Sequence, residues 1–361
     1  MEVIRNWFSR YFSDPQVVIL GVLLLVGLLA IIFAGRYLAP VIASIVIAYL
    51  LDGLVEACQR YGIPRLPAVL VVFSLFFVGM LALLFGLFPI LTRQATQLLQ
   101  EIPAMLSEGQ RLLLTLPERY PAIFSETQIQ EFLDQIRREI AAFSQDLLGQ
   151  TIASVVGVIA FTVYLILVPL LVFFFLKDKH ALLHWGARFM PRERGLAARV
   201  WEEVDTQLGN FIRGKFWEIL IVWAVTYLTF MFMGLNFAML LGFLVGISVL
   251  IPYIGAAVMT FPVALVAYFQ FGWSAELVWI LVAYGVIQAL DGNVLVPILF
   301  SEVVNLHPIA IIVAVLFFGG IWGFWGLFFA IPLAILVQAV INALPGMSES
   351  GADPPEEARA S

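Results

Sequence analysis

Hydrophobic residues fill one long part of the chain, residues 219–275, in which no Asp, Glu, Lys or Arg occurs. A single bilayer crossing needs about 20 apolar residues, so this run is predicted to turn in or near the membrane. We expect the turns at residues 234–236 (Gly-Leu-Asn) and 251–255 (Ile-Pro-Tyr-Ile-Gly), because proline removes a backbone donor and breaks or kinks a helix. Hydrocarbon offers no water to the freed backbone groups, so such a break must be buried in protein or line a wet cavity. This pattern is typical of a transport site.

Other apolar runs predict further helices around this stretch. They cover residues 17–34, 38–51, 66–92, 147–176, 277–290 and 303–344. The second of them meets Asp52 and Glu56, and Arg60 follows one turn later, so we expect a solvated helix end at the membrane interface. Glu218 and Glu276 flank apolar runs and are also expected at the interface. The pattern predicts an all-α, polytopic helical membrane protein.

Two polar regions interrupt the apolar runs. Residues 93–150 carry a stripe of apolar residues at helical spacing after a capping box of Ser125 and Gln128, which predicts an extramembrane amphipathic hairpin. Residues 177–215 are basic, and Met190-Pro191 divides them into two predicted helices. The stripe of the first region is Ile129, Phe132, Leu133, Ile136, Ile140, Phe143 and Leu147, and that of the second basic helix is Val200, Val204, Leu208 and Phe211.

The expected organisation follows from these segments. Three spans lie in residues 1–92, the hairpin in 93–150, a fourth span in 151–176 and the basic helices in 177–215. Residues 216–344 form a transport core of helices broken by Pro and Gly, and 345–361 form a disordered acidic tail. Basic residues mark the cytoplasmic side of a membrane. The N-terminus is therefore predicted to be cytoplasmic, with the 93–150 hairpin on the periplasmic side.

Composition narrows the possible functions. Of the 361 residues, 12% are charged, against about 25% in soluble domains. The net charge of −6 and the lack of a basic array argue against nucleic acid as a partner. The single cysteine, Cys58, excludes an intramolecular disulfide and a cysteine-based metal site. We find no cofactor, metal or nucleotide-binding motif, so we expect no cofactor, no enzyme and no ATPase. A secondary transporter, a facilitator or a channel remains.

Two segments in the last third combine Gly and Pro within apolar sequence. The first contains Pro252, Tyr253 and Gly255, and the second opens at His307 and passes Gly323. Paired interruptions of this kind indicate a transporter site, although tight connections and helix-contact glycines are the alternative interpretation. His307 precedes a proline at a predicted helix start, where capping or packing competes with proton carriage.

A carboxylate also lies between apolar runs. Asp291 is followed by Gly292 and Asn293, with Pro297 beyond. An ionisable group inside a membrane is costly and is usually functional, whereas a helix cap at the interface is the alternative. The candidate transport residues are Pro252, Tyr253, Gly255, Asp291, Asn293, Pro297, His307 and Gly323.

Six segments resemble the autoinducer-2 exporter family of bacterial membrane proteins. They are FFLKDK at 174–179, FIRGK at 211–215, VLIPYIG at 249–255, QALDGNVLVP at 288–297, NLHP at 305–308 and GGIWGFWG at 319–326. The resemblance implies about eight hydrophobic helical segments, some of them re-entrant, in a bilayer whose apolar core each span must match. It also implies a homo-oligomer, a pentamer, in the bacterial inner membrane.

The function expected from this resemblance is export of a small polar signal or metabolite such as autoinducer-2. Some relatives are described as Na⁺ or Li⁺/proton antiporters, so a monovalent cation/proton antiporter is the alternative. A membrane scaffold without transport, recruiting partners through residues 93–150 or 177–215, is a further alternative. Flux measured in proteoliposomes separates the three.

Overall fold

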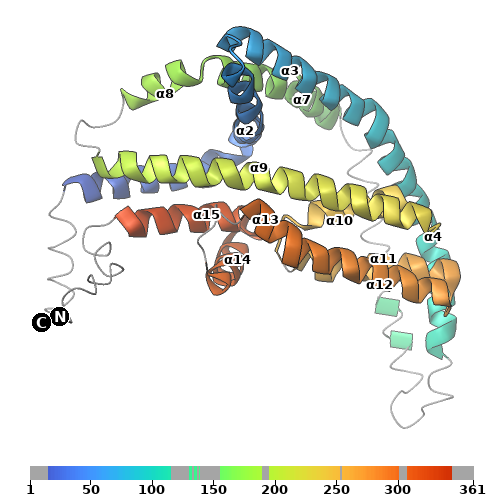
Figure 1. Cartoon of the computed structure of the whole chain (residues 1–361). Coiled ribbons are helices and arrows are strands. Elements are labelled where there is room, and N and C mark those ends of the chain that lie inside the picture. Colours follow the sequence, from blue (N-terminus) through green and yellow to red (C-terminus); the bar gives the residue numbers. More distant parts are fainter. Residues whose placement is uncertain are drawn as a thin grey trace, which may run out of the picture. The chain divides into compact units, whose positions relative to one another are not determined.

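The computed structural model describes residues 15–114, 130–131, 134–135, 138, 155–188, 195–252, 254–300 and 307–343, and within them every regular element is a helix (Figure 1). This confirms the all-α, polytopic fold. Contacts between residues divide the chain into two compact units, which are described separately. Unit 1 takes residues 1–74, 168–219 and 291–361, and unit 2 takes residues 75–167 and 220–290.

Unit 1 begins with α2 (Pro15–Arg60), one continuous helix where the apolar pattern suggests two runs. It also holds the start of α3 (Arg65–Ala82), the end of α7 (Val155–Lys177), α8 (Lys179–Ala187) and the first part of α9 (Gly195–Phe232). Its last elements are η2 (Asp291–Leu295), α13 (Val296–Phe300), α14 (Pro308–Trp322) and α15 (Phe324–Ala343). The helix predicted after Met190-Pro191 is confirmed as part of α9, which is much longer than expected because it continues into the next apolar run.

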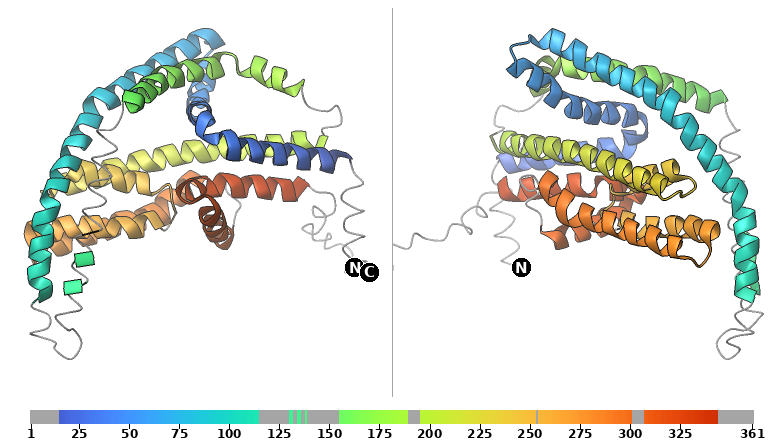
Figure 2. Two further views of the ribbon diagram at one scale, coloured as in Figure 1. Left: turned by 180° about the vertical axis from the view of Figure 1, so that it is seen from behind. Right: turned by 45° about the vertical axis from the view of Figure 1, so that its right-hand side comes forward.

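Apolar side chains hold unit 1 together at three places. Leu20 of α2 packs with Leu196 and Val200 of α9 and with Ala339 of α15. Phe211 of α9 packs with Ile331 and Ile335 of α15, against Phe300 and Ile311. The third cluster joins α14 to α15 through Ala314, Val315, Ala330 and Ala334. Small residues at this last contact let the two helices approach closely although α14 leaves α15 at a steep angle (Figure 1 and Figure 2, left).

Unit 2 contains the folded-back part of the uncharged run. After α9 ends at Phe232, the chain forms α10 (Ala238–Ser248), α11 (Ile254–Phe271) and α12 (Ala275–Leu290). Helices α11 and α12 lie side by side (Figure 1 and Figure 2, right). The two turns predicted within residues 219–275 are therefore confirmed.

The turn between α9 and α10 is held by a side chain of α11. Gly234 and Phe237 both have positive φ, 71° and 58°, and the Gln270 amide donates to the Gly234 carbonyl at 2.7 Å. Its oxygen accepts from the Asn236 backbone N–H, also at 2.7 Å. These bonds satisfy backbone groups that have no helical partner, which a turn in apolar surroundings requires.

Two π-helical turns precede prolines in the same register. Turn η1 (Leu83–Leu87) ends two residues before Pro89 at the start of α4 (Phe88–Leu114), and η2 ends two residues before Pro297. A proline ring clashes with the carbonyl four residues earlier, which lies inside the π-turn in both cases. The wider turn moves that carbonyl aside, so the proline accounts for the local geometry.

Several helices match the dimensions of a bilayer. Among the described residues, five helices are long and apolar enough to cross a membrane, and a sixth span results if the pair α7–α8, bent by 81°, is counted as one. Helix α10 has 11 residues, which at the α-helical rise is about 16 Å, roughly half the apolar thickness. Helix α10 is thus too short to cross alone, as expected for a broken or re-entrant segment.

Some predictions concern residues outside this description. The apolar stripe of 129–147, the Met190-Pro191 pair and the acidic tail lie outside the described residues. The described part of the 93–150 region is the second half of α4 with five further positions, and it is helical.

Candidate functional site

Two ionisable residues of α9, Lys215 and Glu218, are buried. Glu218, expected at the interface, is 2% exposed, and Lys215 is 7% exposed. The Lys215 ammonium lies 2.7 Å from a carboxylate oxygen of Glu218, one helical turn away. A charge is buried only when it is paired, so the lysine explains why the carboxylate can leave the interface. Neither residue was a sequence candidate for the site, although opposite charges three apart beside an apolar run are a detectable signal.

Asp291 joins this pair from η2. It interacts electrostatically with Lys215 and with Glu218. Its Oδ1 is inaccessible to solvent and makes no hydrogen bond within the described part of the chain. Single π-turns occur frequently at functional sites, and here the turn carries the carboxylate. We define Lys215, Glu218 and Asp291 as the charged cluster.

Phe300 of α13 forms an apolar wall beside the charged cluster. The Lys215 ammonium lies 5.4 Å from the centre of its ring, within the range of a cation–π interaction. A Cβ at Gly214 would lie 2.7 Å from the same ring, so glycine is needed there for α13 to approach α9. Phe300 also packs against Phe211 and the α14–α15 pair. The segment around Asp291 and the second predicted hairpin therefore lie together in unit 1.

The charged cluster contains the kinds of residue that line solute and ion pathways in membrane proteins. Two carboxylates and one ammonium lie among apolar helices, where an uncompensated charge is costly. A cation or a proton that reaches the cluster changes the balance of its charges, and a polar solute can accept or donate hydrogen bonds there. The charged cluster is therefore the candidate site for a small polar or cationic species.

Both predicted hairpins contain a very close backbone contact at a glycine. A Cβ at Gly255 in α11 would lie 1.8 Å from the carbonyl oxygen of Ser248 in α10. A Cβ at Gly326 in α15 would lie 1.8 Å from the carbonyl oxygen of Phe318 in α14. The two hairpins, one in each unit, therefore share the same feature: a glycine packed against a backbone carbonyl of the preceding helix. This agrees with the paired interruptions seen in the sequence.

The remaining candidate residues have these positions. Pro252 lies between α10 and α11, and Tyr253 lies outside the described residues. Asn293 and Pro297 are exposed on η2 and α13. His307 caps α14, its Nδ1 accepting from the Ile309 backbone N–H at 3.3 Å, as the capping interpretation expects.

Gly323 breaks α14 from α15 with φ 59°, a conformation that favours glycine. Pro252 and Gly255 belong to unit 2 and the other described candidates to unit 1. A single site formed by all of them stays a prediction.

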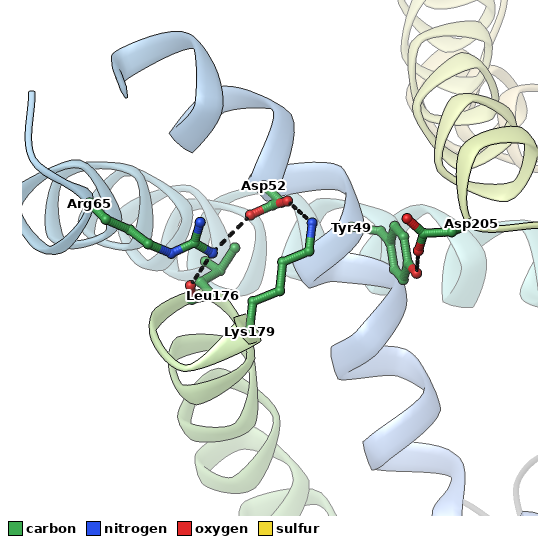
Figure 3. A network of polar contacts seen from close by, with 6 residues as sticks. All are labelled: Tyr49, Asp52, Arg65, Leu176, Lys179 and Asp205. Carbon is green, nitrogen blue, oxygen red and sulfur yellow. Dashed lines mark hydrogen bonds and ion pairs between the residues drawn. The ribbon is translucent and has the colours of Figure 1, made fainter. Parts of the chain in front are cut away.

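A second polar network in unit 1 corrects the interpretation of Asp52 (Figure 3). Asp52 is 7% exposed, not solvated. Its carboxylate lies 2.6 Å from the Lys179 ammonium and 3.4 Å from the Arg65 guanidinium. The guanidinium also donates to the Leu176 carbonyl at 2.8 Å. One carboxylate thus joins the end of α2 to the start of α3 and to the α7–α8 bend, which is a structural role.

Comparison with known proteins covers nearly the whole chain. The sequence profile described as AI-2E family transporter matches residues 22–346. "Putative permease PerM" of Escherichia coli strain K12 is 46% identical over 345 residues, covering 96% of this chain and 98% of that protein. "Putative transport protein YueF" of Bacillus subtilis is 26% identical over 317 residues, 86% of this chain and 84% of that protein. "AI-2 transport protein TqsA" of Escherichia coli strain K12 is 24% identical over 331 residues, 91% and 92% of the two chains.

These matches agree with the architecture. The long apolar helices fit a multi-pass membrane protein, and the names of the relatives are those of permeases and transport proteins. The resemblance noted in the six sequence segments is confirmed. The chain belongs to the AI-2E transporter family, a family of membrane transporters.

Proposed function

We propose that the protein is a secondary transporter or facilitator, without ATPase activity, that exports a small polar signal or metabolite such as autoinducer-2. The charged cluster of Lys215, Glu218 and Asp291 carries this proposal, because ionisable groups among apolar membrane helices are costly to bury and usually mark a substrate or ion pathway. The family match and the name of the TqsA relative support the class of solute. The protein acts in the bacterial inner membrane, with a cytoplasmic N-terminus, as a homo-oligomer.

Flux through proteoliposomes tests this function. The purified protein is reconstituted, and efflux of autoinducer-2 and of a panel of small polar solutes is measured with and without Na⁺, Li⁺ or K⁺ gradients. We expect efflux of a neutral polar solute above protein-free vesicles. Absence of flux for every solute and ion would favour the scaffold alternative.

A cation/proton antiporter is the second candidate, and the two carboxylates of the charged cluster favour it. Such an exchanger needs a group that alternates between a proton and a cation, and Asp291 with its unbonded Oδ1 has the required chemistry. An Na⁺ or Li⁺ gradient should then drive a pH change inside the vesicles. Solute efflux without any cation-linked pH change would remove this candidate.

Asp291→Asn separates the two candidates in one variant. The change keeps the size and one acceptor oxygen but removes the charge. An antiporter should lose cation-linked proton exchange, whereas a neutral-solute exporter should keep efflux at a reduced rate. The matched control is Glu276→Gln, which neutralises an exposed carboxylate at the start of α12. Wild-type flux in both variants would exclude Asp291 from the site.

A further inference from the structure

A pocket lies in unit 1 between the end of α2 and the middle of α9, apart from the charged cluster. Its volume is about 460 Å³, within the range of small-molecule sites. One part of its wall is apolar, formed by Leu50, Leu54, Phe216 and Trp217. The other part is charged, formed by Glu56, Arg60 and Arg213. A ligand that fits both parts must be amphipathic.

The two arginines give the charged part a net positive charge. Arg60 is the last residue of α2, is exposed and makes no ion pair with any residue that the structure describes. The Arg213 guanidinium donates to the neutral Asn210 oxygen at 2.6 Å. Among described residues neither Arg213 nor Glu56 forms an ion pair. Two guanidinium groups and one carboxylate therefore face the pocket with an excess of one positive charge.

The Arg213 side chain lies close to two glycines. A Cβ at Gly53 of α2 would lie 3.4 Å from the Arg213 Cδ, and a Cβ at Gly209 of α9 would lie 3.6 Å from its Nη2. The arginine side chain thus lies across two surfaces without side chains. Arginine presents planar paired donors that match the oxygens of a phosphate group. The arrangement provides an oriented guanidinium at the pocket.

The apolar part faces outward. Leu54 of α2 and Phe216 and Trp217 of α9 are all exposed, as side chains that contact acyl chains in a membrane-spanning helix are. Tryptophan is enriched at the interface between a bilayer and water. Anionic lipids at a bilayer surface attract basic side chains such as Arg60 and Arg213.

We propose that this pocket binds an anionic phospholipid, with its phosphate at Arg60 and Arg213 and an acyl chain along Leu54, Phe216 and Trp217. The chemistry of the wall supports a lipid over a freely soluble anion, because most of the lining is apolar and Leu54, Phe216 and Trp217 are exposed. This proposal is independent of the solute transported, since lipid retention and not flux reports on it.

Lipid retention after purification tests the proposal. Native mass spectrometry of the delipidated protein, given equal amounts of phosphatidylglycerol and phosphatidylethanolamine, counts the lipids retained per protomer. We expect wild type to prefer phosphatidylglycerol, and the Arg60→Gln/Arg213→Gln variant to lose at least about tenfold in its retention, because both charge-assisted contacts to the phosphate are removed. Arg93→Gln, at an exposed position of α4, is the matched control and should retain the wild-type preference.

A second variant keeps the charges and removes the space. Ala57→Trp places an indole in the pocket lining, so it should lower phosphatidylglycerol retention while leaving both arginines in place. Equal retention of the two lipids by wild type would overturn the proposal. So would competition by inorganic phosphate at the lipid concentration, which would indicate a soluble anion. Dissociation of an oligomer by Ala57→Trp without loss of lipid would show that a second copy fills the pocket.

Discussion

Lys215 and Glu218 of α9 can both be buried because they form an ion pair with each other. Each charge is compensated by the other across 2.7 Å, and both are almost fully enclosed. Removing one partner leaves an unpaired charge inside apolar surroundings, whereas removing both leaves only the Asp291 carboxylate of the charged cluster. The stability of the pair and its function can therefore be separated by substitution.

We expect Lys215→Met to lower the unfolding free energy by about 3–5 kcal/mol, because Glu218 then stays buried without a partner. Glu218→Gln should be less destabilising, because Lys215 keeps its interaction with Asp291. The Lys215→Met/Glu218→Leu double variant should recover part of the loss, because Asp291 then remains without the lysine. Thermal or denaturant unfolding in detergent measures all three. Additive losses in the double variant would mean that the two charges act independently.

Asp52 has one partner far along the chain, Lys179 of α8, and one close in sequence, Arg65 of α3. Asp52→Asn should lower the unfolding free energy by about 1–3 kcal/mol, since it weakens two charged contacts between a buried carboxylate and partly buried donors. Glu56→Gln, one turn further along α2 and exposed, is the control and should change stability by less than about 0.5 kcal/mol. Equal effects of the two substitutions would contradict the structural role of Asp52.

At the scale of elements, the two hairpins depend on the contact between a glycine and a carbonyl. The sequence makes Gly255 a candidate transport residue. The structure packs Gly255 against Ser248, so substitution there acts on folding as well as on any transport role. Substituting the glycine should therefore have the same effect in the pair α10–α11 as in the pair α14–α15.

Gly255→Ala and Gly326→Ala should each cost about 1–3 kcal/mol of unfolding free energy, because the added methyl group must push two backbones apart. Gly285→Ala in α12 has open space at its Cβ. It should leave stability unchanged or raise it by up to about 1 kcal/mol through the better helix propensity of alanine. Thermal melting of the three variants under one condition gives the comparison. A neutral Gly255→Ala would mean that the hairpin is not closely packed.

At the scale of the whole molecule, orientation rests on the distribution of basic residues. In a Cys58→Ser background, a cysteine replacing Gln100 on α4 should react with a membrane-impermeant thiol reagent in intact cells. A cysteine replacing His184 on α8 should react only after lysis. Both positions are exposed in the structure. The reverse labelling pattern would invert the topology.

Much of the fold could be predicted from the sequence because it depends on residues that lie close together in the chain. The turns at 234–236 and 251–255 follow from Gly and Pro in an uncharged run, and His307 as a helix cap follows from the proline after it. The charged cluster could not be predicted in the same way. Asp291 lies more than 70 residues from Lys215 along the chain, and Asp52 is 127 residues from Lys179. Such partners depend on tertiary packing, which hydrophobic periodicity does not encode.

The close approach at Gly255 and Gly326 has a consequence at the level of the gene. Every single-base change in a glycine codon that alters the residue introduces a Cβ or a stop, and a Cβ at either position would lie 1.8 Å from a carbonyl oxygen. Membrane-facing positions of Leu, Ile or Val can instead exchange for one another in one step with little change in volume. In a saturation library selected for folded protein, we expect these two glycine codons to vary only synonymously while the neighbouring apolar codons drift.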